Sequence, residues 1–62
     1  MMFNLKSVRQ EKGYTQQQLS EKSGVSRVAI SLIESGRSKS IKTETLAKLA
    51  DALGKKPSDL FF

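Results

Sequence analysis

Hydrophobic residues in this chain recur at the three- and four-residue spacing of amphipathic helices. The clearest series lies in the segment 43–54 and consists of Leu46, Leu49, Ala50 and Leu53. Thr43 is a candidate N-cap before this series, and Gly54 is a typical stop residue after it. The pattern predicts a helix with one apolar face.

Cap and stop residues predict further helices of the same short kind. Asn4 is a candidate N-cap whose side chain can accept from free amides of the first turn. Thr15 and Gln18 have the spacing of a capping box, and Pro57 suits a first helical position. The predicted ranges are about 4–12, 16–23 and 57–62.

The segment 26–34 carries apolar residues on two faces of its predicted helix, for which Ser26 is the N-cap. At about 100° per residue, one face holds Ala29, Ile30 and Ile33. The opposite face holds Arg27, Val28, Ser31 and Leu32. The first face is expected in the core, and the second has the chemistry needed to contact base edges in a DNA groove.

Together these segments predict an all-α fold, a compact bundle of five short helices in a single domain over 1–62. A chain of 62 residues buries about 60% of its unfolded surface. Because cysteine is absent, helix packing must stabilise the fold without disulfides. Tyr14 and Ile41 are expected to add their side chains to the core.

Composition then limits the possible functions. The chain has 11 Lys and Arg against 6 Asp and Glu, a net charge of +5, which favours a polyanionic partner such as nucleic acid. It has no histidine or cysteine, so serine hydroxyls have no evident base, and we expect no enzyme, metal site, cofactor or small-molecule ligand. No apolar run approaches the roughly 18 residues of a membrane span, so no membrane partner is expected.

The residues from Thr15 to Gly36 have the order and spacing of two helices joined by a tight turn. The residues that carry this pattern are Gln16, Leu19, Ser20, Gly24, Val25, Ile30, Ile33 and Glu34. They resemble the helix-turn-helix of the phage Cro/repressor (XRE) family, and residues 5–9 and 46–54 extend the likeness over nearly the whole chain. The resemblance implies a lambda-repressor-like domain whose second and third helices form the helix-turn-helix.

The resemblance also implies a function. It describes a small transcriptional regulator, a repressor, that binds a palindromic operator in double-stranded DNA as a homodimer. Such a protein is cytoplasmic and encoded by a bacterium or a phage. The alternative from a different class is a protein-interaction or antitoxin-like module that uses the same helix to bind a protein.

In this family the third helix lies in the major groove. The base-contacting residues expected here are Arg27, Val28 and Leu32, with Ser26 and Ser31 in support. The phosphate-contacting residues expected here are Gln16, Gln17, Ser35, Arg37, Lys39 and Lys42. Arg27 can donate two bonds to guanine, but a phosphate contact is the other use of its charge.

Two further expectations concern pairs of side chains. By resemblance, Arg9 and Glu34 form a structural ion pair between the first and third helices. Val28 and Leu32 are expected to contact thymine methyl groups, to bind another protein, or to be partly buried.

The C-terminal apolar residues Leu60, Phe61 and Phe62 are the expected dimer contact. Packing of Phe61 into its own core is the competing use of that ring.

Overall fold

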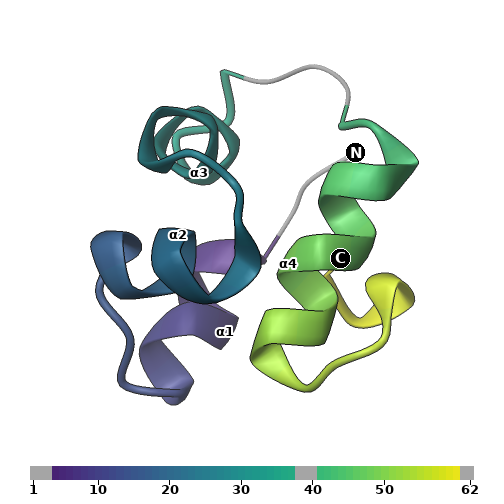
Figure 1. Ribbon diagram of the computed structural model, residues 1–62, viewed down its shortest axis with the longest axis horizontal. Coiled ribbons are helices and arrows are strands. Elements are labelled where there is room, and N and C mark those ends of the chain that lie inside the picture. Colours follow the sequence, from purple (N-terminus) through teal and green to yellow (C-terminus); the bar gives the residue numbers. More distant parts are fainter. Residues whose placement is uncertain (1–3, 38–40, 61–62) are drawn as a thin grey trace.

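Short helices make up most of the computed structural model, which describes residues 4–37 and 41–60 (Figure 1). The elements are α1 (Leu5–Glu11), α2 (Gln16–Ser23), α3 (Arg27–Glu34), α4 (Thr43–Leu53) and a 3-10 turn (Pro57–Leu60). The described ranges contain no strand. The predicted all-α class is therefore confirmed.

The fifth predicted helix is a single 3-10 turn over Pro57–Leu60 and not an α-helix. Its bonds span three residues: the Asp59 amide donates to the Lys56 carbonyl at 2.9 Å, and the Lys56 amide donates to Asp59 Oδ2 at 3.0 Å. Four residues leave no room for a series of α-helical bonds.

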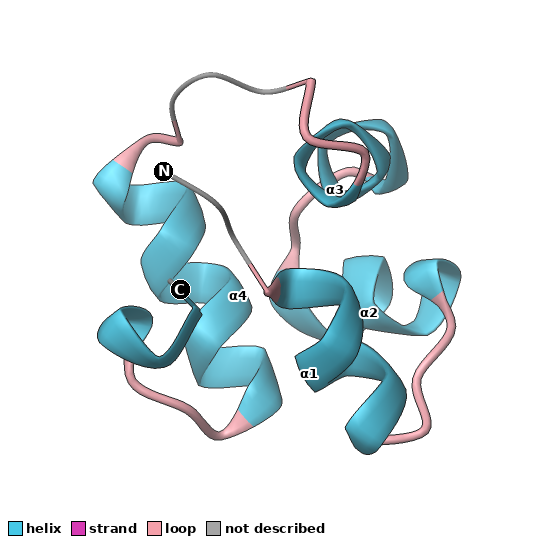
Figure 2. Cartoon of the chain, turned by 180° about the vertical axis from the view of Figure 1, so that it is seen from behind, coloured by secondary structure: helices cyan, strands magenta, loops and turns pink. Residues whose placement is uncertain are grey.

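The helices pack around one core, with α2 against both α3 and α4, α1 against α3, and the 3-10 turn against α4. The buried apolar residues are Leu5, Val8, Leu19, Val25, Ile30, Ile33, Leu46, Leu49, Ala50, Leu53 and Leu60. Tyr14, Ala29 and Ile41 pack against this core while partly exposed, as expected for all three. Viewed from both sides, α3 lies at the edge of the molecule beyond α1 and α2 (Figures 1 and 2).

The turn between α2 and α3 fixes the direction of α3. Gly24 has φ of 77°, a left-handed conformation that glycine adopts without steric cost, and its amide donates to the Ser20 carbonyl at 2.9 Å. Val25 then places its side chain in the core. The Ser26 hydroxyl accepts from the Ala29 amide at 3.1 Å, so the predicted cap of α3 is confirmed.

Two other predicted caps differ in part from the prediction. Asn4 is the N-cap of α1 as predicted, and its carbonyl accepts from the Val8 amide at 3.1 Å. Its side chain makes no cap bond, however, and its φ of −102° and ψ of 29° differ from the extended conformation usual at this position. The N-cap of α4 is Lys42 rather than Thr43, because Lys42 has the extended conformation and its carbonyl accepts from the Leu46 amide at 3.0 Å. The Thr15 and Gln18 capping box is present as predicted.

Leu60 does not have the position expected of a dimer contact. Its side chain is 1% exposed and belongs to the core, where the 3-10 turn packs on α4. Burial within its own chain removes Leu60 from any surface available to a second copy. Phe61 and Phe62, the other two residues of that expectation, lie outside the described residues.

Within the described ranges, no helix combines the length and apolar character needed to cross a membrane.

Candidate nucleic-acid interface

The outer face of α3 is the exposed surface with mixed chemistry that the sequence predicts. Val28 is 70% exposed and Leu32 is 43% exposed, and they are the exposed large hydrophobic residues of the described chain. Arg27 and Ser31 are exposed beside them. Because Ile30 and Ile33 on the opposite face are buried, packing fixes which side of α3 meets solvent.

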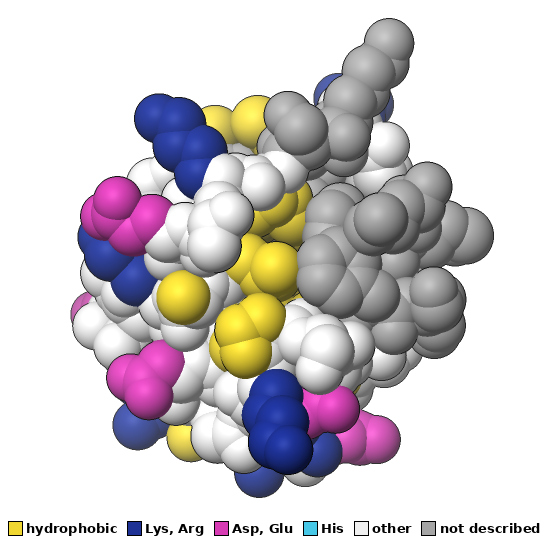
Figure 3. Space-filling view, turned by 90° about the vertical axis from the view of Figure 1, so that its right-hand side faces the viewer, with side chains coloured by type: hydrophobic (Ala, Val, Ile, Leu, Met, Phe, Trp, Pro, Cys, Tyr) yellow, Lys and Arg dark blue, Asp and Glu magenta, His cyan; other side chains and the backbone are white. Residues whose placement is uncertain are grey.

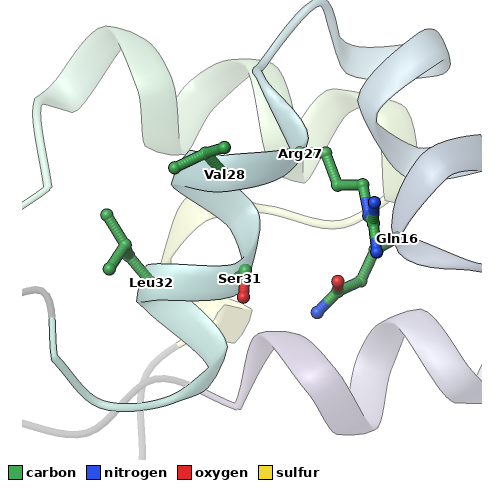
Figure 4. Close-up of a pocket in the computed structure, with 5 residues that line it drawn as sticks. All are labelled: Gln16, Arg27, Val28, Ser31 and Leu32. Atoms are coloured by element: carbon green, nitrogen blue, oxygen red, sulfur yellow. The ribbon is translucent and has the colours of Figure 1, made fainter.

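A shallow hollow of about 220 Å³ lies along this face. It is lined by Gln16, Arg27, Val28, Ser31 and Leu32. In Figure 4 the side chain of Arg27 extends toward Gln16, whereas Val28 and Leu32 lie on the other side of α3. The hollow therefore has a hydrogen-bonding side and an aliphatic side.

A buried ion pair links α1 to the end of α3. Arg9 Nε donates to Glu34 Oε2 at 2.7 Å and Arg9 Nη2 donates to Glu34 Oε1 at 2.9 Å, which is a bidentate arrangement. Arg9 Nη1 also donates to the Tyr14 carbonyl at 2.7 Å. The hydrogen bond to Glu34 raises the pKa of Arg9 and outweighs burial, which acts in the opposite direction.

Gln16 joins this ion pair. As the first residue of α2, it donates from Nε2 to Glu34 Oε1 at 3.1 Å. The Glu34 side chain is only 4% exposed. Its carboxylate accepts hydrogen bonds from residues of two other helices, α1 and α2. The expected role of Gln16 is phosphate contact, and its bond to Glu34 was not predicted, because nothing in the local sequence indicates that residues 16 and 34 meet.

A second hollow, of about 290 Å³, adjoins the first and shares Gln16 and Ser31 with it. Its other lining residues are Lys6, Arg9, Glu34 and Ser35. Lys6 was not predicted at this surface, although its i, i+3 spacing to Arg9 places the two on one side of α1.

The charges that line the two hollows favour an anionic occupant. Lys6, Arg9 and Arg27 are cationic, whereas Glu34 is the one acid in either lining. Arg9 neutralises Glu34 through the ion pair. Lys6 and Arg27 therefore contribute an uncompensated positive charge to this surface.

The α4 side of the molecule differs from this surface. Figure 3, which shows the side at the right of Figure 1, has some hydrophobic side chains near its middle and both cations and anions around them. One opposite-charge pair on α4 joins Lys48 Nζ to Glu44 Oε1 at 3.2 Å.

The remaining expected contact residues have varied positions. Gln17, Arg37 and Lys42 are exposed, and Lys39 lies outside the described residues. Ser35 is exposed, and its hydroxyl donates to the Leu32 carbonyl at 3.0 Å. The hydroxyl oxygen of Ser26 is engaged in the cap of α3, so any DNA contact by Ser26 has to use its remaining hydrogen-bonding capacity.

Comparison with known proteins gives one finding on the family. A family model described as helix-turn-helix matches residues 5–60, which covers all four helices and the 3-10 turn. No curated protein and no solved structure matches the chain.

Proposed function

Because the chain belongs to the Cro/repressor-type (XRE) family of helix-turn-helix DNA-binding domains, we propose that it is a transcriptional repressor that binds a specific DNA sequence. DNA binding in the regulation of transcription is the function of the family. Repression, in which the bound domain occupies the operator, is our proposal for this chain.

The observation that carries this proposal is the outer face of α3. Arg27, Val28 and Leu32 project from a helix whose other side is fixed in the core. A B-DNA major groove is about 12 Å wide and admits one α-helix. We propose that α3 lies in that groove, with its N-terminal residues at the base edges.

Each side chain on this surface then has a proposed role. Arg27 donates to the O6 and N7 atoms of a guanine, while Ser26 and Ser31 assist. The proposed phosphate contacts are those of Gln16, Gln17, Ser35, Arg37, Lys39 and Lys42. They position α3 without carrying sequence information.

We propose further that two copies bind a palindromic operator. Helix-turn-helix dimers bind half-sites about one helical turn apart, about 34–36 Å. With Leu60 in the core, the dimer contact would involve Phe61, Phe62 and α4.

Selection of binding sites from randomised duplexes tests the proposal. The wild-type protein should recover one sequence motif, and Arg27→Ala should lose discrimination at one guanine, a cost of about 1–3 kcal/mol. Lys48→Ala is the matched control, because it removes one charge from an exposed position on α4. It should recover the wild-type motif.

Two results would contradict the proposal. If the wild-type protein recovers no motif, sequence-specific DNA binding is contradicted. If α3 then binds a protein, the interaction-module alternative is favoured. An identical motif with Arg27→Ala would remove Arg27 from the base contacts.

A further inference from the structure

Val28 and Leu32 form an aliphatic pair that remains uncovered in the folded chain. They are four residues apart on α3 and therefore lie on the same side of the helix, one turn from each other. Partial burial, one of the uses open to them from the sequence, does not describe Val28, which is 70% exposed. Because no residue within 4–37 or 41–60 covers Val28, we consider a bound partner as what covers the pair.

The surroundings of the pair favour a polyanion over an apolar protein surface. The same hollow is lined by Arg27, and the adjoining one by Lys6, with no unpaired acid in either lining. The volume of this hollow, about 220 Å³, is also smaller than that of typical small-molecule pockets, which is about 300–1,000 Å³. A small apolar group carried by a polyanion fits both observations.

Duplex DNA offers one such group in its major groove, the C5-methyl of thymine. We infer that Val28 and Leu32 bind the methyl groups of two thymines in the operator, beside the guanine contacted by Arg27. This inference rests on the proposed function. It specifies two thymines in each half-site of the operator.

The helix geometry limits how far apart the two thymines are. Four residues advance about 6 Å along an α-helix, and successive base pairs are about 3.4 Å apart. An α3 that follows the groove therefore places the two methyl groups within about two base-pair steps. The guanine lies on the Gln16 side of the hollow, toward which Arg27 extends (Figure 4).

The two contacts are expected to differ in strength. Val28 is more exposed than Leu32 and lies nearer the N-terminus of α3, where helix-turn-helix proteins contact bases. More apolar surface is therefore available for a methyl group to cover at Val28. Loss of the thymine that faces Val28 should weaken binding more than loss of the other.

Replacement of thymine by uracil in the selected duplex tests the inference, because uracil lacks only the C5-methyl group. Each thymine of the motif is replaced in turn, and the Kd is measured for the wild-type, Val28→Ala and Leu32→Ala proteins. For the wild type, two replacements within about two base-pair steps should weaken binding, by about fourfold at the thymine that faces Val28 and by less at the other. Val28→Ala should lose this difference at one position and Leu32→Ala at the other.

Uracil at a thymine that flanks the motif is the control, and it should leave the Kd unchanged. Val28 is largely exposed, so Val28→Ala should keep the wild-type melting temperature. Leu32 is more than half covered, so the comparison of thymine with uracil duplexes within each variant separates a lost contact from lost stability. A motif in which uracil is tolerated at every position would overturn the inference and leave the proposed function intact. Variants that weaken binding equally for thymine and uracil duplexes would also overturn it, and recovery of no motif would overturn both.

Discussion

Among single residues, Glu34 has the most connected side chain of the interface. It accepts from Arg9 on α1 and from Gln16 on α2, and it is itself the last residue of α3. Three helices thus meet at one carboxylate, directly behind the surface proposed to meet DNA. The position of α3 relative to α1 and α2 depends on this carboxylate keeping its partners.

Arg9→Ala should destabilise the fold strongly. Removal of one partner of a buried ion pair costs about 3–5 kcal/mol, because the other charge stays buried without compensation. A domain of this length has about 3–9 kcal/mol in total, so urea denaturation followed by circular dichroism should show the variant near its unfolding limit.

The double variant Arg9→Ala/Glu34→Gln separates the lost charge from lost packing. A neutral amide in place of the carboxylate should recover about 1 kcal/mol or more relative to Arg9→Ala. Equal stability of wild type and Arg9→Ala would show that the pair does not stabilise the fold.

At the scale of elements, side-chain caps stabilise helix ends, and the start of α2 has the most complete cap. Thr15 and Gln18 satisfy two amides reciprocally, at 3.0 Å from the Gln18 amide to Thr15 Oγ1 and 2.9 Å from the Thr15 amide to Gln18 Oε1. Gln16, which donates to Glu34, lies between the two residues of this capping box. The capping box therefore stabilises the end of α2 that lies at the proposed interface.

Thr15→Ala should lower the free energy of unfolding by about 1 kcal/mol, because an orphan amide loses its acceptor. In a domain of this size the melting temperature should fall by about 4–8 °C. Thr43→Ala is the matched control: it changes the same residue type at the first position of α4, where no side-chain cap exists, and should shift the melting temperature little. Similar losses in both variants would contradict the role given to the capping box.

The same caps show how far the sequence predicted the fold. Apolar spacing and glycine stops placed all four α-helices, because those signals are local. Asn4 is the N-cap of α1, but its predicted side-chain bond does not form, and its amide instead donates to the distant Leu60 carbonyl at 3.0 Å, which no local signal indicates. The exposed face of α3 was predictable from periodicity, whereas the bond from Gln16 to Glu34 depends on how two helices pack.

At the scale of the whole molecule, the net charge of +5 bears on how the protein associates with DNA. Each phosphate neutralised by a cation releases counterions, so log K falls with log salt by about 0.9 per contact. Arg37 and Lys42 are exposed, and both lie in the segment that joins α3 to α4. Both are proposed phosphate contacts. The salt dependence of the DNA-binding constant measures how many such contacts form.

Salt titrations on duplexes with one or two half-sites therefore test the phosphate contacts and the dimer together. Arg37→Gln or Lys42→Gln should reduce the slope by about 0.9 on a single half-site and by about 2 on the palindrome, because a dimer loses the contact twice. Lys48→Gln, which removes a charge from α4, should leave both slopes unchanged. Equal slopes for the wild-type protein on the two duplexes would contradict a dimer, since two bound copies must release about twice as many counterions as one.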